Sequence, residues 1–177
     1  MTEPTAQPTP APSPTEAEGA GVPLNQAVRQ VITVHLSNIP LLNGLAPHVL
    51  QQVGATMQFR TVEKGAYVMH KGSPGDHLVF LLSGRVQVLD VTEDGREIVL
   101  SSLSPGDYVG EMAVIDGQPR SASVQAADTS LVAFLPRAHA QQLLYANPLV
   151  AERVMQRLAG TVRAAAANRA ILSLPSA

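Results

Sequence analysis

The residue types that could bind an anion are concentrated between positions 105 and 124. Gly110 precedes a segment, 111–115, that can form a single helical turn, and the first N–H groups of a helix have no partner within it. Such N–H groups stabilise negative charge, and Gly110 would let a ligand come close to the backbone. Arg120, entering a predicted strand, adds a planar guanidinium that matches a phosphate. The stretch therefore predicts a phosphate site.

Glu111 is a carboxylate beside this predicted anion site, where it would repel an anion that it faced. The conflict disappears if Glu111 points away from the phosphate and accepts a hydrogen bond from a hydroxyl group of the ligand. A ribose 2′-hydroxyl fits that description, so the residues together indicate a sugar phosphate. An ordinary salt bridge between Glu111 and Arg120 is a second interpretation that the residues alone leave open.

Other site chemistries find less support in the sequence. The chain has no cysteine, no Gly-x-Ser-x-Gly motif and no His-x-His pair of the kind that a metal-dependent cupin enzyme would need. We therefore expect no catalytic residues, no metal site and no enzyme, with the cupin as the weakest alternative. The histidines are scattered, at His35, His48, His70, His77 and His139.

The charge balance argues against nucleic acid as a partner of this chain alone. The 12 basic residues are outnumbered by 14 acidic ones, only Lys64 and Lys71 are lysines, and no basic cluster occurs. No apolar run reaches the ~18 residues of a membrane span, and no secretory signal is recognisable. We expect a cytoplasmic protein that does not bind a membrane.

Short strands are predicted around the site. Segments rich in β-formers alternate with turns such as 72–76, and Asp94-Gly95 is typical of a two-residue hairpin turn with positive φ at both positions. Many short strands with regular turns favour a jelly-roll, or double-stranded β-helix, over a parallel sheet. The expected strands are residues 57–62, 67–70, 77–83, 85–91, 96–103, 121–126 and 130–135.

Helices are expected to flank this mainly β domain. A short amphipathic helix is predicted from Leu24 to about His35, and a second one from Pro47 to near Gly54. A third spans residues 136–145, and a long one begins at Pro148. The buried stripes are predicted to be Leu24, Ala27, Val28 and Val31 in the first helix and Val49, Leu50 and Val53 in the second.

The long C-terminal helix carries apolar residues at coiled-coil spacing. We expect this face to form a homodimer, because its alanines allow close approach and residues 164–167 are strong helix formers. The alternative is a helix that lies on its own β-domain. The apolar set is Ala151, Met155, Leu158, Val162, Ala165 and, after an interruption at Arg169, Leu172.

The first 23 residues hold six prolines and little that could be buried. This composition predicts a disordered tail, with a Pro-rich docking ligand as the less favoured interpretation. The expected organisation is a tail at 1–23, a β-domain with its N-terminal helices at 24–146, the long helix at 147–172 and a short tail at 173–177.

Residues 105–124 resemble the phosphate-binding segment of the cyclic nucleotide-binding domain family. That family includes catabolite-activator-type regulators, regulatory subunits of cyclic-AMP-dependent protein kinase and nucleotide-gated channels. Its pattern of Gly-Glu, apolar residues, a spacer and Arg-Ser/Thr/Ala-Ala is matched by Gly110-Glu111-Met112-Ala113-Val114-Ile115 and Pro119-Arg120-Ser121-Ala122. The turns at 72–76 and 104–107 and the segment 81–86 also match, so the resemblance covers roughly residues 36–172.

The resemblance implies a β-roll whose ligand is cAMP or cGMP and which needs no other cofactor. Arg120 would pair with the exocyclic phosphate oxygens, Glu111 would accept the ribose 2′-hydroxyl, and Gly110 would let the ribose lie against the backbone. Binding would reposition the C-terminal helix and change contacts with a second copy or an unidentified effector protein. The other contacts would come from the N–H groups of Met112, Ala113 and Ala122 and from the Ser121 hydroxyl.

Two departures from the family pattern affect this expectation. No helix-turn-helix domain follows the long helix, so direct control of transcription by this chain is not expected. Ala165 and Ala166 stand where bacterial activators carry hydroxyl residues that recognise adenine, which leaves the base preference open. Arg163, Asn168 or Arg169 could cap the base instead. The alternative function is a domain that kept the fold for protein interactions but lost its ligand.

Overall fold

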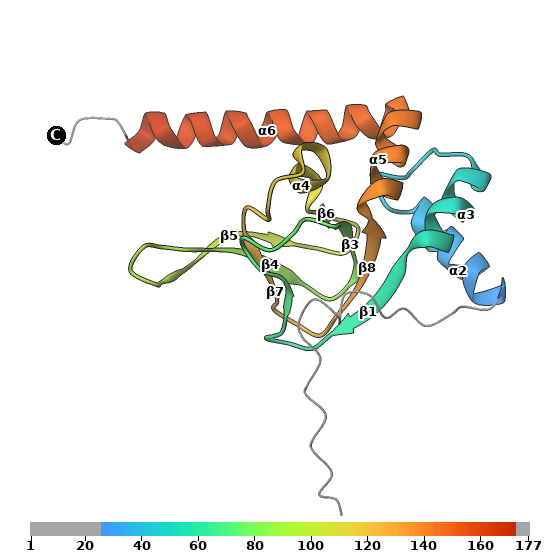
Figure 1. Ribbon diagram of the computed structural model, residues 1–177, viewed down its shortest axis with the longest axis horizontal. Helices are drawn as coiled ribbons and strands as arrows, with labels where there is room; N and C mark the ends of the chain where they lie inside the picture. Colours follow the sequence, from blue (N-terminus) through green and yellow to red (C-terminus); the bar gives the residue numbers. More distant parts are fainter. Residues whose placement is uncertain (1–25, 173–177) are drawn as a thin grey trace, which may run out of the picture.

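The structure, a computed structural model, describes residues 26–172 (Figure 1). The predictions for the 1–23 tail, Leu24 and residues 173–177 lie outside the described residues, as do those for the side chains of Val28, Arg169 and Leu172. Helices α2 (Gln26–Ser37) and α3 (Pro47–Thr56) precede the strands, and α5 (Arg137–Ala146) and α6 (Pro148–Leu172) follow them. The expected mainly β domain with flanking helices and a long C-terminal helix is confirmed.

Eight strands form two antiparallel four-stranded sheets. One sheet has the order β1-β8-β3-β6 and the other β2-β7-β4-β5. Neighbouring strands in each sheet are mostly far apart in the chain, and the chain passes repeatedly from one sheet to the other. This topology is that of a β-roll. The strands are β1 (Gln58–Val62), β2 (Tyr67–Met69), β3 (His77–Ser83), β4 (Val86–Val91), β5 (Glu97–Leu103), β6 (Tyr108–Val109), β7 (Ser123–Ala126) and β8 (Ser130–Pro136).

Strands β3 and β8 are buried on both faces, which explains their nearly unbroken apolar sequences. In β3, Val79 and Leu81 point into the space between the sheets, whereas Leu78 and Phe80 pack against the helices. A strand covered on both sides needs apolar residues at every position, because its side chains alternate between faces. The helix-facing core also takes Leu36, Leu50, Leu143 and Val150, one from each flanking helix.

Two details of the predicted N-terminal helices are wrong. Gly54 does not end α3, which continues to Thr56; Gly54 instead lies where a side chain would come within 3.3 Å of Leu36, so it lets α2 and α3 pack closely. In α2 the predicted stripe is not the buried one, since Ala27 is exposed and Val31 is 57% exposed. Leu36, at 1% exposure, provides the main anchor.

The β4–β5 hairpin is also closed differently from the prediction. The Thr92 N–H donates to the Arg96 carbonyl, and the Gly95 N–H donates to the Thr92 carbonyl, so the loop has three residues. Only Gly95 has positive φ there, at 82°, and Asp94 does not. This is the pattern of a turn followed by a bulge, not of a two-residue primed turn. Strand β7 begins at Ser123 and not at Ser121, because the chain bends at 121–122.

Helix α6 lies on its own domain mainly through residues outside the predicted apolar seam. Its buried residues are Val150 and Val154, at 0% and 2% exposure, whereas Met155 and Val162 of the seam are 61% and 68% exposed. Leu158 is partly buried and packs against the same core. The far part of α6 extends beyond the β-roll (Figure 1). One face of α6 thus belongs to this chain's core and another carries exposed apolar residues.

Candidate functional site

The predicted anion site lies in the connection from β6 to β7, residues 110–122, called the cassette here. Its short helix α4 (Glu111–Asp116) is bounded by two glycines in the left-handed conformation, Gly110 with φ of 94° and Gly117 with φ of 68°. Residues with a Cβ rarely adopt that conformation. The two glycines therefore allow a single helical turn to be inserted between two strands, as the sequence predicted for residues 111–115.

Arg120 brings its guanidinium to the beginning of α4. The residue is only 4% exposed; its Nη2 donates a hydrogen bond to the His77 carbonyl at 2.8 Å and its Nη1 donates to the Gly110 carbonyl at 3.5 Å. A Cβ at Gly110 would collide with the guanidinium. Because arginine stays ionised in proteins, a positive charge is held beside the first turn of α4, where unbonded N–H groups also favour an anion.

The turn between β2 and β3 fixes the backbone of Arg120. The Arg120 N–H donates to the Ser73 carbonyl at 2.9 Å, and its carbonyl accepts from the Gly72 N–H at 2.8 Å. Gly75 lies so close to Ala113 of α4 that no Cβ would fit there. The turn thus holds both ends of the cassette, because it contacts α4 as well as Arg120.

The other predicted site residues surround the same turn with different exposures. Glu111 is partly exposed and Ala113 is buried, while Met112 is 49% exposed. Ser121 is exposed and Ala122 partly so, next to Arg120. Of the seven predicted residues, the structure brings the side chain of Arg120 against Gly110, and the others flank this contact along the chain: Glu111, Met112, Ala113, Ser121 and Ala122.

Several contributors to the site were not identified from the sequence. His77 and Ser73 act through their carbonyl oxygens, which every residue type has, so the sequence carries no signal for them. Ser123 acts through its side chain: its Oγ accepts a hydrogen bond from the Lys71 N–H at 2.9 Å. The glycine-rich turn at 72–76 was the available signal, since a tight turn packed on the cassette needs residues without side chains.

Tyr108 and Arg157 connect the neighbourhood of the cassette to α6. Tyr108, on β6, is 6% exposed, and the Arg157 guanidinium lies over its ring, 4.1 Å from the centroid. Burial raises the pKa of the Tyr108 hydroxyl above its usual value, and the positive charge of Arg157 partly opposes that rise. This cation–π contact joins the long helix to the strand that leads into Gly110.

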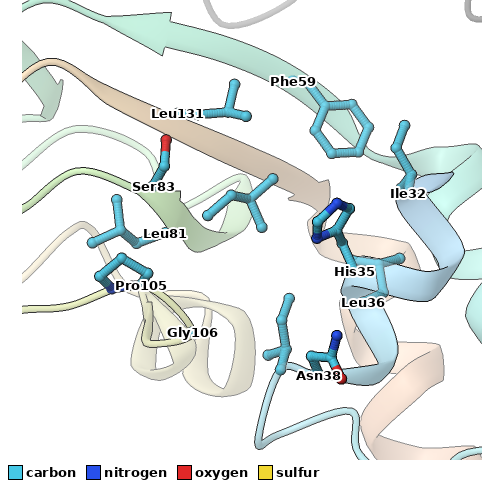
Figure 2. Close-up of a pocket in the computed structure, with 12 residues that line it drawn as sticks. Ile32, His35, Leu36, Asn38, Phe59, Leu81, Ser83, Pro105, Gly106 and Leu131 are labelled. Atoms are coloured by element: carbon cyan, nitrogen blue, oxygen red, sulfur yellow. The ribbon is translucent and has the colours of Figure 1, made fainter. Parts of the chain in front are cut away.

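A separate, mainly apolar pocket lies between α2 and the sheet that contains β1, β8 and β3. Figure 2 shows Phe59, Ile32 and Leu131 around this cavity of about 590 Å³. Its lining includes His35, Asn38 and Ser83 but no Arg, Lys, Asp or Glu, and it shares no residue with the cassette. A search for cavities alone would therefore miss the cassette. The cassette is the better candidate for an anion site, because the charge of Arg120 and the N–H groups of α4 lie there.

The described part of the chain offers neither a metal cluster nor a membrane span. Within residues 26–172, no three His, Asp or Glu side chains come together in a way that could hold a metal ion. No helix among the same residues is both long and apolar enough to cross a bilayer.

The sequence profile of the cyclic nucleotide-binding domain matches residues 59–147, which run from the second residue of β1 to just past the end of α5. The chain belongs to the cyclic nucleotide-binding domain family. This membership agrees with the resemblance of the cassette and with the two-sheet fold.

Relatives of this cyclic nucleotide-binding domain occur in several kinds of regulatory protein. The chain is 38% identical over 130 residues to a cyclic nucleotide-gated potassium channel of Mesorhizobium japonicum, covering 73% of this chain and 34% of the channel. It is 32% identical over 138 residues to the cyclic AMP receptor protein of Thermus thermophilus, covering 78% of this chain and 64% of that protein. The chain thus corresponds to only a part of these relatives.

Solved structures of the same family have the same fold. The catabolite activator protein of Thermus thermophilus superposes with a TM-score of 0.68 at 32% identity, covering 76% of this chain and 63% of that one. A triple mutant of the regulatory subunit of a cAMP-independent protein kinase A from Trypanosoma brucei, bound to cAMP in its A site, gives a TM-score of 0.65 at 27% identity over 73% of this chain and 46% of that one.

Proposed function

We propose that this domain binds a cyclic nucleotide in the cassette and serves as a regulatory module. The observation that carries the proposal is the buried guanidinium of Arg120, held against Gly110 at the beginning of α4. A fixed bidentate cation next to helix N–H groups suits a phosphate diester that has two free oxygens. Family membership identifies a cyclic nucleotide as the class of phosphate.

Each cassette residue has a part in this proposal. Arg120 pairs with the exocyclic phosphate oxygens, and the N–H groups of Met112, Ala113 and Ala122 complete the anion site. Glu111 is partly exposed and therefore free to reach a ribose 2′-hydroxyl. Gly110 leaves room for the ribose, and the exposed hydroxyl of Ser121 adds a contact.

In this proposal the base of the nucleotide is recognised from α6. Arg163 and Asn168 lie on the exposed far part of this helix, beside the alanines at 165 and 166 that offer no hydroxyl group. We propose cAMP as the first ligand to test, because the relative from Thermus thermophilus is named a cyclic AMP receptor protein. A comparison with cGMP then measures how much the base contributes.

Regulation would follow from movement of α6. Its contact through Arg157 to Tyr108 places it next to the strand that enters the cassette, so a bound nucleotide would favour one position of the helix over another. A ligand changes such an equilibrium only through a difference in affinity for the two positions. The exposed seam of α6, containing Met155 and Val162, is the surface through which we propose a homodimer, with an effector protein as a further partner.

Isothermal titration calorimetry with cAMP and with cGMP tests the binding proposal. We expect the unmodified domain to bind at least one of them and Arg120→Ala to bind it tenfold to several hundredfold more weakly, roughly the effect of losing one charge-assisted hydrogen bond or two. Arg96→Ala is the matched control, because it removes the same charge from the exposed end of the β4–β5 hairpin.

The melting temperature of each ligand-free variant is measured alongside. The ligand-free melting temperature shows whether Arg120→Ala still folds. Adding the cyclic nucleotide should then raise the melting temperature of any variant that binds it, because a ligand that binds only the native state stabilises that state. Equal affinity of Arg120→Ala and the unmodified domain would contradict the proposed site. Absence of binding by the unmodified domain would favour an interaction module without a ligand.

A further inference from the structure

The carbonyl oxygen of Val114, in the last turn of α4, accepts two side-chain hydrogen bonds from α5. Arg137 Nε donates to it at 3.3 Å and Gln141 Nε2 donates to it at 3.1 Å. Val114 is fully buried, and the preceding carbonyl, that of Ala113, already accepts the Gly117 N–H at 2.9 Å. The end of α4 is thus bonded partly to its own last turn and partly to a separate helix.

Arg137 is held at a point where three segments meet. Its backbone N–H donates to the Asp76 carbonyl at 2.7 Å, which ties it to the turn between β2 and β3. Its guanidinium lies against Gly117, where a Cβ would come within 2.9 Å of Nη2. Arg137 therefore contacts both the end of α4 and the turn that fixes Arg120.

The cassette depends on such outside support because α4 is so short. The helix has six residues and lies between Gly110 and Gly117, two residues whose backbone is intrinsically permissive. A helix of this length has no stability of its own in water, so its position is set by the groups that contact it. At its C-terminal end the contacts are those from Arg137 and Gln141.

We infer that Arg137 and Gln141 are positioning residues of the cassette, which hold α4 in register with Arg120 and connect it to the C-terminal helices. The inference rests on the proposed function, because it assigns these residues to the nucleotide site. Helix α5 ends at Ala146 and α6 begins at Pro148, so the two residues that hold the end of α4 lie on the helix directly before α6. Neither residue needs to touch the nucleotide.

Methionine substitutions test the inference, because methionine reaches as far as the donating atoms, Gln Nε2 and Arg Nε, and keeps a high helix propensity but cannot donate a hydrogen bond. We expect Arg137→Met/Gln141→Met to bind cAMP about tenfold more weakly in calorimetry, the loss typical of buried hydrogen bonds. Gln142→Met is the matched control: it is the same substitution on the same helix at an exposed position. It should bind cAMP as the unmodified domain does.

Two further readouts separate positioning from general stability. Arg137→Lys keeps a cationic donor and should recover part of the lost affinity, whereas a role in packing alone predicts no such recovery. In the ligand-free protein, the amide protons of Val114 and Gly117 should exchange faster in the double variant than in Gln142→Met. A double variant that binds cAMP normally, or one that loses affinity no more than Gln142→Met does, would overturn the inference.

The same exchange measurement distinguishes failure of this inference from failure of the proposed function. If the unmodified domain binds neither cyclic nucleotide, the proposed function fails, and the exchange rates of the α4 amides still decide whether α5 positions α4. If the unmodified domain binds cAMP and the α4 amides exchange equally in all variants, the positioning role is wrong while the proposed function stands.

Discussion

At the scale of single residues, Gly110 and Gly65 share a backbone conformation but differ in their surroundings. Their φ angles are 94° and 86°, yet a Cβ at Gly110 would collide with Arg120, whereas nothing lies within 4 Å of one at Gly65. Gly110→Ala should therefore displace the Arg120 guanidinium and weaken cAMP binding by about tenfold or more, in addition to a backbone cost of about 1–3 kcal/mol. Calorimetry and chemical denaturation measure the two effects.

Gly65→Ala is the control for that experiment, because it carries the backbone cost without the collision. We expect it to lower the free energy of unfolding by about 1 kcal/mol and to leave the affinity for cAMP unchanged. If Gly110→Ala loses no more affinity than Gly65→Ala, then the contact between Gly110 and Arg120 does not shape the site.

Lys71 and Asp90 give a residue-scale prediction about pH. The Lys71 ammonium donates to Asp90 Oδ1 at 2.6 Å and holds the pKa of that carboxyl below its usual value. The stabilisation from the pair is present above the ordinary pKa of Asp and is lost as the pH falls through the lowered pKa. Lys71→Met should raise the pKa of Asp90 toward its ordinary value, as measured by NMR titration of the carboxyl carbon. Lys64→Met, also at an exposed lysine, should leave it unchanged.

The sequence was most informative about the residues whose type is itself the signal. Gly110, Glu111 and Arg120 were predicted to cooperate from their types and spacing, and the structure brings them into one cassette. The support from Ser73 and His77 could not be predicted, because backbone carbonyls become specific only through the fold.

At the scale of elements, the contact between Arg157 and Tyr108 should hold α6 against β6. A partly buried cation–π pair contributes about 0.5–2 kcal/mol, so Arg157→Gln should speed amide exchange in the part of α6 around it. The same change removes the charge that lowers the pKa of Tyr108, so that pKa should rise further. Exchange measured by mass spectrometry and NMR titration of the ring check both effects.

Arg163→Gln is the matched control, since residue 163 is exposed on the same helix. It should change neither the exchange around residue 157 nor the pKa of Tyr108 in the ligand-free protein. Unchanged exchange in Arg157→Gln would show that the other contacts of α6, among them those of Val150, Val154 and Leu158, hold the helix on the domain without the cation–π pair.

Element boundaries were predictable where local chemistry decides them and not where packing does. The strands followed alternation and turn residues closely, with β3 found at the predicted residues 77–83. Gly54 was mistaken for a helix end because a glycine that ends a helix and a glycine that lets two helices pack look alike in sequence. Likewise, apolar periodicity in α2 could not show that Val31 would be exposed and Leu36 buried.

At the scale of the whole molecule, β5 and α6 are two of the elements that carry exposed apolar residues. Strand β5 exposes Ile98, Val99 and Leu100 at 47%, 52% and 57%, and α6 exposes Met155 and Val162. The β4–β5 hairpin and the far end of α6 project from the same side of the molecule (Figure 1). Clustered exposed apolar surface is typical of an interface, so this side is the expected place for a second copy.

The seam of α6 decides whether that second copy binds through the helix. Met155 and Val162 recur seven residues apart, as in a coiled-coil contact, and they lie outside the face that Val150 and Val154 bury in the domain. We expect the unmodified protein to have twice the mass of one chain in sedimentation equilibrium. The variant Met155→Glu/Val162→Glu should have the mass of one chain, because dimerisation would remove its two charged side chains from water. Gln156→Glu/Thr161→Glu adds the same charge to exposed positions beside the seam and should stay dimeric. A monomeric unmodified protein, or a seam variant that dimerises as well as its control, would show that the long helix has another use.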